Sequence, residues 1–86
     1  MHIYHSSQFE RQYKKLPVKI QDLVEAREAL FIKDPFDPRL KTHKLSGNLE
    51  GFWSYSVSYS YRIIFEFLHN KKDIRLHDIG THDVYE

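Results

Sequence analysis

The sequence contains no cysteine, so a disulfide framework and a thiolate metal site are both excluded. This absence is compatible with a reducing compartment. The chain also lacks any apolar run close to the roughly 20 residues of a membrane-spanning helix. Residues 1–5 have no signal-peptide character, and there is no internal repeat, low-complexity tract or linker. These absences predict a cytoplasmic protein without a membrane segment.

The sequence also has little excess charge of either sign. Thirteen Lys and Arg residues stand against twelve Asp and Glu residues, which gives a formal net charge of +1. This is weak for a protein that must hold a phosphate backbone, so any electrostatic site for nucleic acid must be local. The densest positive stretch consists of Arg39, Lys41, His43 and Lys44. The alternative interpretation of this stretch is an ordinary polar loop.

The length of 86 residues leaves room for a single domain over residues 1–86, with one hydrophobic core. A chain of this size buries only about 60 to 65 per cent of its surface on folding. Such a domain often gains stability from a bound partner.

The first half of the chain has the pattern of a short strand followed by two helices. Residues 2–5 alternate polar and apolar, and Ser7 and Glu10 have the spacing of a capping box for the first helix. Pro17 suits the first turn of the second helix, and the prolines in 34–38 end it. The apolar stripe of the second helix consists of Ile20, Leu23, Val24, Leu30 and Phe31.

In the second half the apolar period changes to two, which is typical of strands. Residues 53–60 and 61–68 alternate in this way and predict neighbouring antiparallel strands, and a last strand is expected over 74–79. The apolar face of the first run consists of Trp53, Tyr55, Val57 and Tyr59. The predicted fold is therefore α+β, in β-α-α-β-β-β order. Two N-terminal helices pack on one face of a small, mainly antiparallel sheet, and the opposite face is free.

Four residues far apart in the sequence have side chains suited to cleavage of RNA, namely His43, Arg62, His82 and Tyr85. This reaction needs a base for the 2′-hydroxyl proton, an acid for the departing 5′-oxygen and a fixed cation for the phosphoryl oxygens. Two imidazoles and a guanidinium supply all three. The tyrosine can stack on a base or donate a hydrogen bond to phosphate.

Each of these four residues also has a structural interpretation. His43 can brace its loop, and Arg62 can form an ion pair with Glu66 on the same face of its strand. His82 can be an exposed terminal residue, and Tyr85 can pack into the core. The residue types alone therefore leave both interpretations open.

A metal site is a second possible arrangement, built from His77, Asp78, His82 and Asp83. Neighbouring residues of a strand face opposite ways, so His77 and Asp78 are not expected to share an ion. No His-Glu-x-x-His or similar spacing supports such a site. We expect neither a metal nor a cofactor.

Several short motifs follow one another in the second half, namely Leu45-Ser46-Gly47, Trp53-Ser54-Tyr55, Tyr61-Arg62-Ile63-Ile64-Phe65-Glu66 and Asp78-Ile79-Gly80-Thr81-His82-Asp83. In order and spacing they resemble the RelE/YafQ/HigB toxins of the RelE/ParE superfamily, from type II toxin–antitoxin systems. The resemblance covers nearly the whole chain and implies a RelE-like fold. It also implies an endoribonuclease that cleaves mRNA, typically on the ribosome, without a metal and by 2′-hydroxyl attack. The implied protein partner is a cognate antitoxin.

The resemblance assigns a role to each candidate residue. His43 and His82 match histidines of YafQ-like members and are expected to act as general acid and general base, in either order. Arg62 matches a strand arginine and is the expected phosphate clamp, whereas Tyr85 is expected to stack on a base or orient the phosphate. The expected substrate-binding residues are Arg39, Lys41, Lys44 and Trp53.

Three features depart from the family pattern. Ser56 stands where relatives carry a basic residue or a histidine, and Ser60 stands where YafQ-like members carry an aspartate. The spacing from His82 to Tyr85 is one residue shorter than in many relatives. Two alternatives therefore stay open: a ParE-like toxin that binds DNA gyrase without cleaving RNA, and a degenerate member that only binds an antitoxin.

Overall fold

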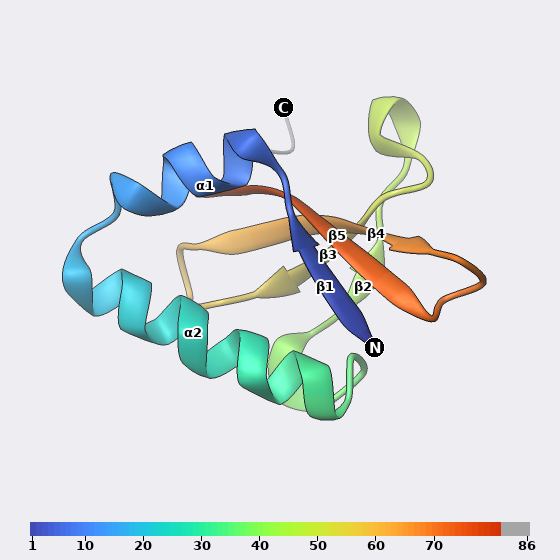
Figure 1. The fold of residues 1–86 in the computed structure, drawn as a ribbon, viewed down its shortest axis with the longest axis horizontal. Coiled ribbons are helices and arrows are strands. Elements are labelled where there is room, and N and C mark those ends of the chain that lie inside the picture. Colours follow the sequence, from blue (N-terminus) through green and yellow to red (C-terminus); the bar gives the residue numbers. More distant parts are fainter. Residues whose placement is uncertain (82–86) are drawn as a thin grey trace.

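The computed structural model describes residues 1–81, and Figure 1 shows their arrangement. The strands are β1 (His2–His5), β2 (His43–Lys44), β3 (Trp53–Ser56), β4 (Arg62–Leu68) and β5 (Asp73–Gly80). The α-helices are α1 (Ser7–Lys14) and α2 (Val18–Lys33), and the 3₁₀ helices are η1 (Pro38–Leu40) and η2 (Gly47–Leu49). The predicted α+β fold is confirmed. The predicted order lacked β2, because a strand of two residues is too short to produce an apolar period.

The strands form one sheet in the order β1-β5-β4-β3-β2. β1 pairs with β5 in parallel and all other neighbouring pairs are antiparallel, so the mainly antiparallel sheet is confirmed. Trp53 lies opposite Phe65, and Tyr55 lies opposite Ile63. The aromatic side chains of β3 and the apolar side chains of β4 therefore share one face.

Helices α1 and α2 lie on the apolar side of the sheet and diverge from the short link between them (Figure 1). The Ser6 hydroxyl caps α1 by accepting a hydrogen bond from the Phe9 N–H at 3.0 Å. The same hydroxyl donates to the His77 carbonyl oxygen at 2.8 Å, which ties the helix start to β5. The predicted capping box at Ser7 and Glu10 is thus wrong by one residue.

No helix within residues 1–81 is long and apolar enough to cross a bilayer.

Phe31 joins α2 to the sheet. Its fully buried ring stacks on Tyr55 with centroids 4.6 Å apart and meets Phe65 edge-on at 4.9 Å. Such aromatic pairs add about 0.5–1.5 kcal/mol each beyond the burial of their surface. Phe9 from α1 and Leu40 from η1 belong to the same core.

Two residues that the apolar patterns placed on buried faces are exposed. The Val57 N–H donates to the Tyr61 carbonyl oxygen at 2.9 Å and closes a tight loop. Tyr59 belongs to this loop and is 93% exposed. Strand β3 therefore ends at Ser56 instead of continuing to residue 60. Leu23 is 39% exposed on α2, so it lies at the margin of the stripe.

Helix α1 covers the edge of the sheet where β1 ends. Beyond the last β1 pair, at Leu76, the Ile79 N–H donates to Oε1 of Gln12 at 2.9 Å. The side chains of Gln12 and Gln8 also donate to the Asp78 carboxylate. The helix thereby satisfies a backbone donor that an open edge strand would leave exposed.

Candidate functional site

One face of the sheet points away from the helices, and we call it the outer face. The register places His43 opposite Ser54, Ser54 opposite Ile64, and Ser56 opposite Arg62 on this face. Ser54 and Ile64 have exposed fractions of 0% and 2%. The centre of the outer face is therefore buried, contrary to the prediction of a free face. The side chains of this face that are open to a ligand lie around Ser54 and Ile64.

Arg62 begins β4 on the outer face and is half-buried. Its guanidinium donates to the hydroxyl of Ser56, the residue that departs from the family pattern. The alternative ion pair with Glu66 does not form, because Glu66 accepts from His77 at 2.8 Å and from Arg75 at 3.4 Å. Within residues 1–81 no carboxylate pairs with Arg62. A guanidinium held by a neutral hydroxyl keeps N–H donors available for an anion.

His43 lies exposed on β2, at the edge of the sheet. Its Nδ1 is 2.9 Å from the Lys41 carbonyl oxygen. Since a carbonyl only accepts hydrogen bonds, Nδ1 carries the proton and Nε2 of the neutral ring keeps its lone pair. Lys41 has a left-handed backbone, with φ 53°, a conformation that costs a non-glycine residue about 1–2 kcal/mol. The hydrogen bond holds His43 in the tautomer of a general base.

His43 on β2 and Arg62 on β4 lie on the same face, with β3 between their strands and an offset of two residues in register. Strand spacings of about 4.8 Å and rises of about 3.4 Å per residue place their Cα atoms roughly 12 Å apart. The two side chains do not contact each other, because His43 is bonded to the Lys41 carbonyl oxygen and Arg62 to the Ser56 hydroxyl. A phosphodiester placed between the imidazole and the extended arginine can contact both.

Glu66 and His77 form a carboxylate–imidazole pair on the outer face that the sequence analysis missed. Oε1 of Glu66 is 2.8 Å from Nε2 of His77, and the imidazole meets Phe52 edge-on at 5.0 Å. The β4–β5 ladder shifts register between Ile64 and Phe65, and this irregularity admits His77 as an extra residue. A bulge redirects a side chain without a sequence signal, so only the structure reveals this pair.

Of the four residues considered as a possible metal site, only His77 and Asp78 belong to the described part of the chain, whereas His82 and Asp83 lie outside it. His77 pairs with Glu66, whereas Asp78 accepts hydrogen bonds from Gln8 and Gln12 of α1. Residues 1–81 contain no group of three or more His, Cys, Asp or Glu side chains able to hold a metal ion.

Two of the predicted catalytic residues, His82 and Tyr85, lie outside the described residues, so their roles stay predictions. Gly80, at the end of β5, lies directly opposite Arg62. Strand β5 therefore ends beside Arg62.

The positive stretch at residues 39–44 does not form one patch. Arg39 donates to the Asp37 carboxylate from Nε at 3.0 Å and from Nη2 at 2.9 Å. These side-chain hydrogen bonds, followed by one from the Arg39 backbone N–H, lower the pKa of Asp37 to about 2. The guanidinium fork that was predicted to bind substrate is therefore occupied by a carboxylate, while Lys41 stays exposed.

Lys44 and Trp53 lie on the helix-facing side of the sheet, opposite to Arg62. They pair with each other across β2 and β3, and Trp53 packs against the core beside Phe65. Nζ of Lys44 is 5.5 Å from the centroid of the indole ring. The predicted catalytic and substrate-binding residues therefore do not share one site, because adjacent strand residues point to opposite faces.

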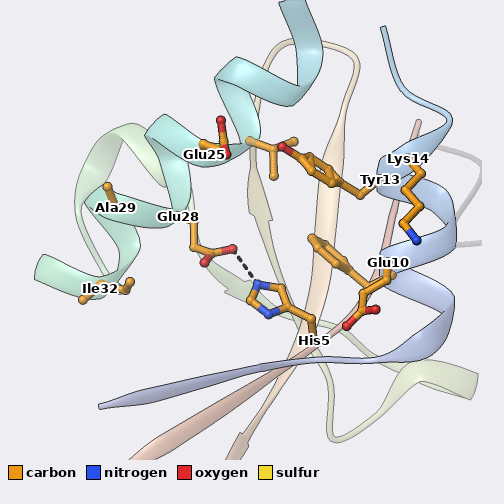
Figure 2. Close-up of a pocket in the computed structure, with 10 residues that line it drawn as sticks. His5, Glu10, Tyr13, Lys14, Glu25, Glu28, Ala29 and Ile32 are labelled. Atoms are coloured by element: carbon orange, nitrogen blue, oxygen red, sulfur yellow. Dashed lines mark hydrogen bonds and ion pairs between the residues drawn. The ribbon is translucent and has the colours of Figure 1, made fainter. Parts of the chain in front are cut away.

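A groove with a volume of about 600 Å³ lies between α1 and α2. Figure 2 shows Tyr13 of α1 across from Glu25 of α2, with His5 bonded to Glu28 at 3.0 Å. Burial, followed by the Glu25 carboxylate, raises the pKa of the Tyr13 phenol. The apolar lining consists of Phe9, Val24, Ala29 and Ile32. The groove is therefore apolar inside and negatively charged along α2.

Comparison with known proteins agrees with this architecture. The family model described as the bacterial toxin of type II toxin–antitoxin system, YafQ, matches residues 1–85. A search of curated proteins found no match.

Solved structures give the same result for the fold. The chain is similar to YafQ from E. coli, with 21% identity and a TM-score of 0.78, over 95% of this chain and 93% of that chain. It is also similar to a YoeB/ParE toxin from Agrobacterium tumefaciens, with 14% identity and a TM-score of 0.80, over 95% and 99% of the two chains. A further match is the E. coli DinJ–YafQ toxin-antitoxin complex, with 21% identity and a TM-score of 0.75, over 95% and 92%. The family match over residues 1–85 shows that the chain belongs to the YafQ family of toxins from bacterial type II toxin–antitoxin systems.

Proposed function

We propose that this toxin is an endoribonuclease that cleaves mRNA and that Arg62 binds the scissile phosphate. One observation carries the proposal: within residues 1–81 the Arg62 guanidinium hydrogen-bonds the Ser56 hydroxyl and forms no ion pair, while Glu66 is engaged by His77 and Arg75. An arginine without a carboxylate partner, on a sheet face shared with a histidine, suits a phosphodiester. The resemblance to RelE-type toxins supports mRNA as the substrate and a reaction without a metal.

The proposed reaction uses the tautomer of His43. Its Nε2 takes the proton of the 2′-hydroxyl, and the 2′-oxygen attacks the adjacent phosphorus as the bond to the 5′-oxygen breaks. His82 donates a proton to the departing 5′-oxygen, so that a 2′,3′-cyclic phosphate and a free 5′-hydroxyl remain. Arg62 stabilises the negative charge that develops on the phosphoryl oxygens, and Tyr85 stacks on a base.

Induction of the toxin in bacterial cells, followed by mapping of mRNA 5′ ends, tests this proposal. The wild type should produce new cuts within translated codons, on ribosome-bound mRNA. Arg62→Ala should lower the cleavage rate by about 10²- to 10³-fold, the usual effect of removing one transition-state donor. Arg11→Ala changes an exposed arginine of α1 and should cleave like the wild type.

The same mapping of mRNA 5′ ends distinguishes the roles of His43, His77 and His82. His43→Gln and His82→Gln should each reduce cleavage, whereas loss of cleavage in His77→Gln alone would transfer the proton-transfer role to the Glu66–His77 pair. Cleavage by Arg62→Ala at the wild-type rate would contradict the site. Growth arrest without new cuts would indicate a binding target such as DNA gyrase, and neither arrest nor cuts would indicate a degenerate member.

We also propose that the cognate antitoxin inserts a basic amphipathic segment into the groove between α1 and α2. E. coli YafQ, which has a similar fold, forms a complex with the protein DinJ. The floor of the groove can receive apolar side chains, and its lining contains three glutamates but one lysine, namely Glu10, Glu25, Glu28 and Lys14. This excess of carboxylates repels RNA and favours a protein segment with Lys or Arg.

Charge reversal tests the groove. Glu10→Lys and Glu25→Lys, both exposed, should each weaken antitoxin binding by at least about tenfold in titration calorimetry. Glu50→Lys makes the same charge change away from the groove and should bind normally. Unchanged affinity in both groove variants would place the antitoxin elsewhere.

A further inference from the structure

A cluster of three aromatic rings and two lysines lies at the end of the sheet where β3 begins and β4 ends. We call it the Trp53 cluster, and it consists of Phe36, Trp53, Phe67, Lys44 and Lys71. Trp53 meets Phe67 edge-on at 5.2 Å and Phe36 edge-on at 5.6 Å. Phe36 is 51% exposed, so one ring of the cluster remains open to a ligand.

The two lysines converge on the same indole ring. Nζ of Lys44 is 5.5 Å and Nζ of Lys71 is 5.9 Å from its centroid, and Nζ of Lys71 is 5.8 Å from the Phe67 centroid. Neither lysine forms an ion pair within residues 1–81, although Glu50 lines the same hollow of about 370 Å³. A cation–π contact orients an ammonium group but leaves N–H donors free for an anion.

Lys71 lies in the turn before β5, which has an unusual backbone. His69, Asn70 and Lys71 are three consecutive residues in the left-handed region, with φ of 51°, 56° and 68°. Each non-glycine residue in this region costs about 1–2 kcal/mol, and asparagine costs less. The Nδ1 of His69 lies 2.7 Å from the Asp73 carboxylate, which fastens the turn to the strand. Such strain is common where a backbone positions a functional side chain.

We infer that the Trp53 cluster is a second RNA-binding site, in which Lys44 and Lys71 bind backbone phosphates and Phe36 stacks on a base. The two ammonium groups lie over the same indole ring that the half-exposed Phe36 ring meets edge-on. These two kinds of group match the two parts of a nucleotide, its phosphate and its base. The inference rests on the proposed function for the identity of the ligand as RNA. The Trp53 cluster adds a contact surface for RNA that is separate from the surface that contains Arg62.

The position of the cluster defines how RNA meets the toxin. Phe67 and Arg62 are five residues apart on β4, about 17 Å along the strand, and their side chains point to opposite faces. A short extended substrate on the outer face therefore does not reach Trp53. A folded RNA that surrounds the domain contacts both sites at once.

The only tryptophan of the chain, Trp53, reports directly on this site through its fluorescence. We would titrate a short RNA hairpin into the full-length Arg62→Ala variant, which keeps the cluster and removes the proposed phosphate clamp. The emission should change and saturate. Lys44→Gln and Lys71→Gln should each weaken binding about fivefold and lower the salt dependence of log K by about 1. Lys19→Gln, on exposed α2 surface, is the matched control and should bind normally.

Unchanged affinity in a Lys44→Gln/Lys71→Gln double variant, or no change in emission, would overturn the inference. Equal competition by polyglutamate would also overturn it, because the cluster would then be a general anion site and not an RNA site. Binding and cleavage are measured separately. RNA binding at Trp53 in a toxin that makes no cuts would reject only the proposed ribonuclease, and normal cuts without this binding would reject only the second site.

Discussion

Tyr55 has a buried polar atom without a partner within residues 1–81. Its hydroxyl makes no hydrogen bond, although the ring stacks on Phe31 and is fully buried. Burial, followed by the charge of Glu28, raises the pKa of this phenol. An unsatisfied buried hydroxyl costs about 1–3 kcal/mol, so the residue is retained at some cost to stability.

We expect Tyr55→Phe to raise the free energy of unfolding by about 1–3 kcal/mol, because it removes the buried hydroxyl and keeps the stacked ring. Urea denaturation monitored by circular dichroism measures this change. Tyr59→Phe removes the same hydroxyl at a position that is 93% exposed and should have no effect. A less stable Tyr55→Phe variant would mean that the hydroxyl has a partner, such as a buried water.

The charge of Asp37 makes the stability of the toxin depend on pH in the acid range. The Arg39 hydrogen bonds lower its pKa from 3.8 to about 2, so the folded state favours the charged carboxylate. The stabilisation is complete above the unfolded pKa and disappears as the pH falls through the folded pKa. The unfolding free energies of wild type and Asp37→Asn should therefore differ by a constant amount above about pH 5 and converge below about pH 2. A difference that persists at the lowest pH would show that charge is not its origin.

At the scale of secondary-structure elements, α1 acts as a cap on the edge of β5. Its Gln12 side chain accepts from the Ile79 N–H at 2.9 Å and donates to Asp78 at 3.1 Å. A helix thus completes hydrogen bonding along an edge that β1 covers only up to Leu76. The C-terminal half of β5, beside Arg62, depends on this cap for its position.

Gln12→Ala should lower the free energy of unfolding by about 1–3 kcal/mol, because the Ile79 N–H loses its acceptor. Hydrogen exchange followed by NMR should show faster exchange of the Ile79 amide. Arg11→Ala, at the adjacent exposed position of α1, tests for general loss of the helix and should leave that amide protected. Equal exchange rates in both variants would argue against the cap.

At the scale of the whole molecule, a nearly neutral chain separates its charges in space. Carboxylates gather in the groove between the helices, Arg62 stands on the outer face, and two lysines lie in the Trp53 cluster. A net charge of +1 therefore conceals local charge of both signs: the groove that we propose for the antitoxin is acidic, and the two surfaces that we propose for RNA carry cations. The groove, which α2 lines on one side, depends on the packing of this helix against the sheet.

Phe31→Ala tests that packing, because Phe31 is fully buried and contacts Tyr55 and Phe65. The substitution should cost about 3–5 kcal/mol, which is a large part of the roughly 4–13 kcal/mol expected for a domain of this length. Ile32→Ala, at a neighbouring position that is 47% exposed, should cost much less in the same urea titration. Antitoxin at about 100 times its Kd should restore about 2.7 kcal/mol. Equal costs in the two variants would contradict the role of Phe31.

Local patterns predicted the elements well but not their ends. Alternation over 53–68 identified the β3–β4 pair, whereas it could not show that the ladder stops at Ser56 and exposes Tyr59. The two-residue strand β2 was missed because no periodicity exists over that length. The capping serine was misplaced by one because Ser6 and Ser7 differ only in which hydroxyl reaches the helix, and this depends on the path of β1 along β5.

The sequence by itself determined the fold class, because apolar periods of 3.6 and 2 require helices and strands with one buried side. It also determined the family, through motifs whose order survives in the linear chain. Only the tertiary structure decided which residues meet. It paired Arg39 with Asp37, directed Arg62 to Ser56, joined Glu66 to His77 through a bulge, and placed Trp53 and Arg62 on opposite faces. These contacts join residues through strand register and backbone irregularity, and neither leaves a periodic signal in the sequence.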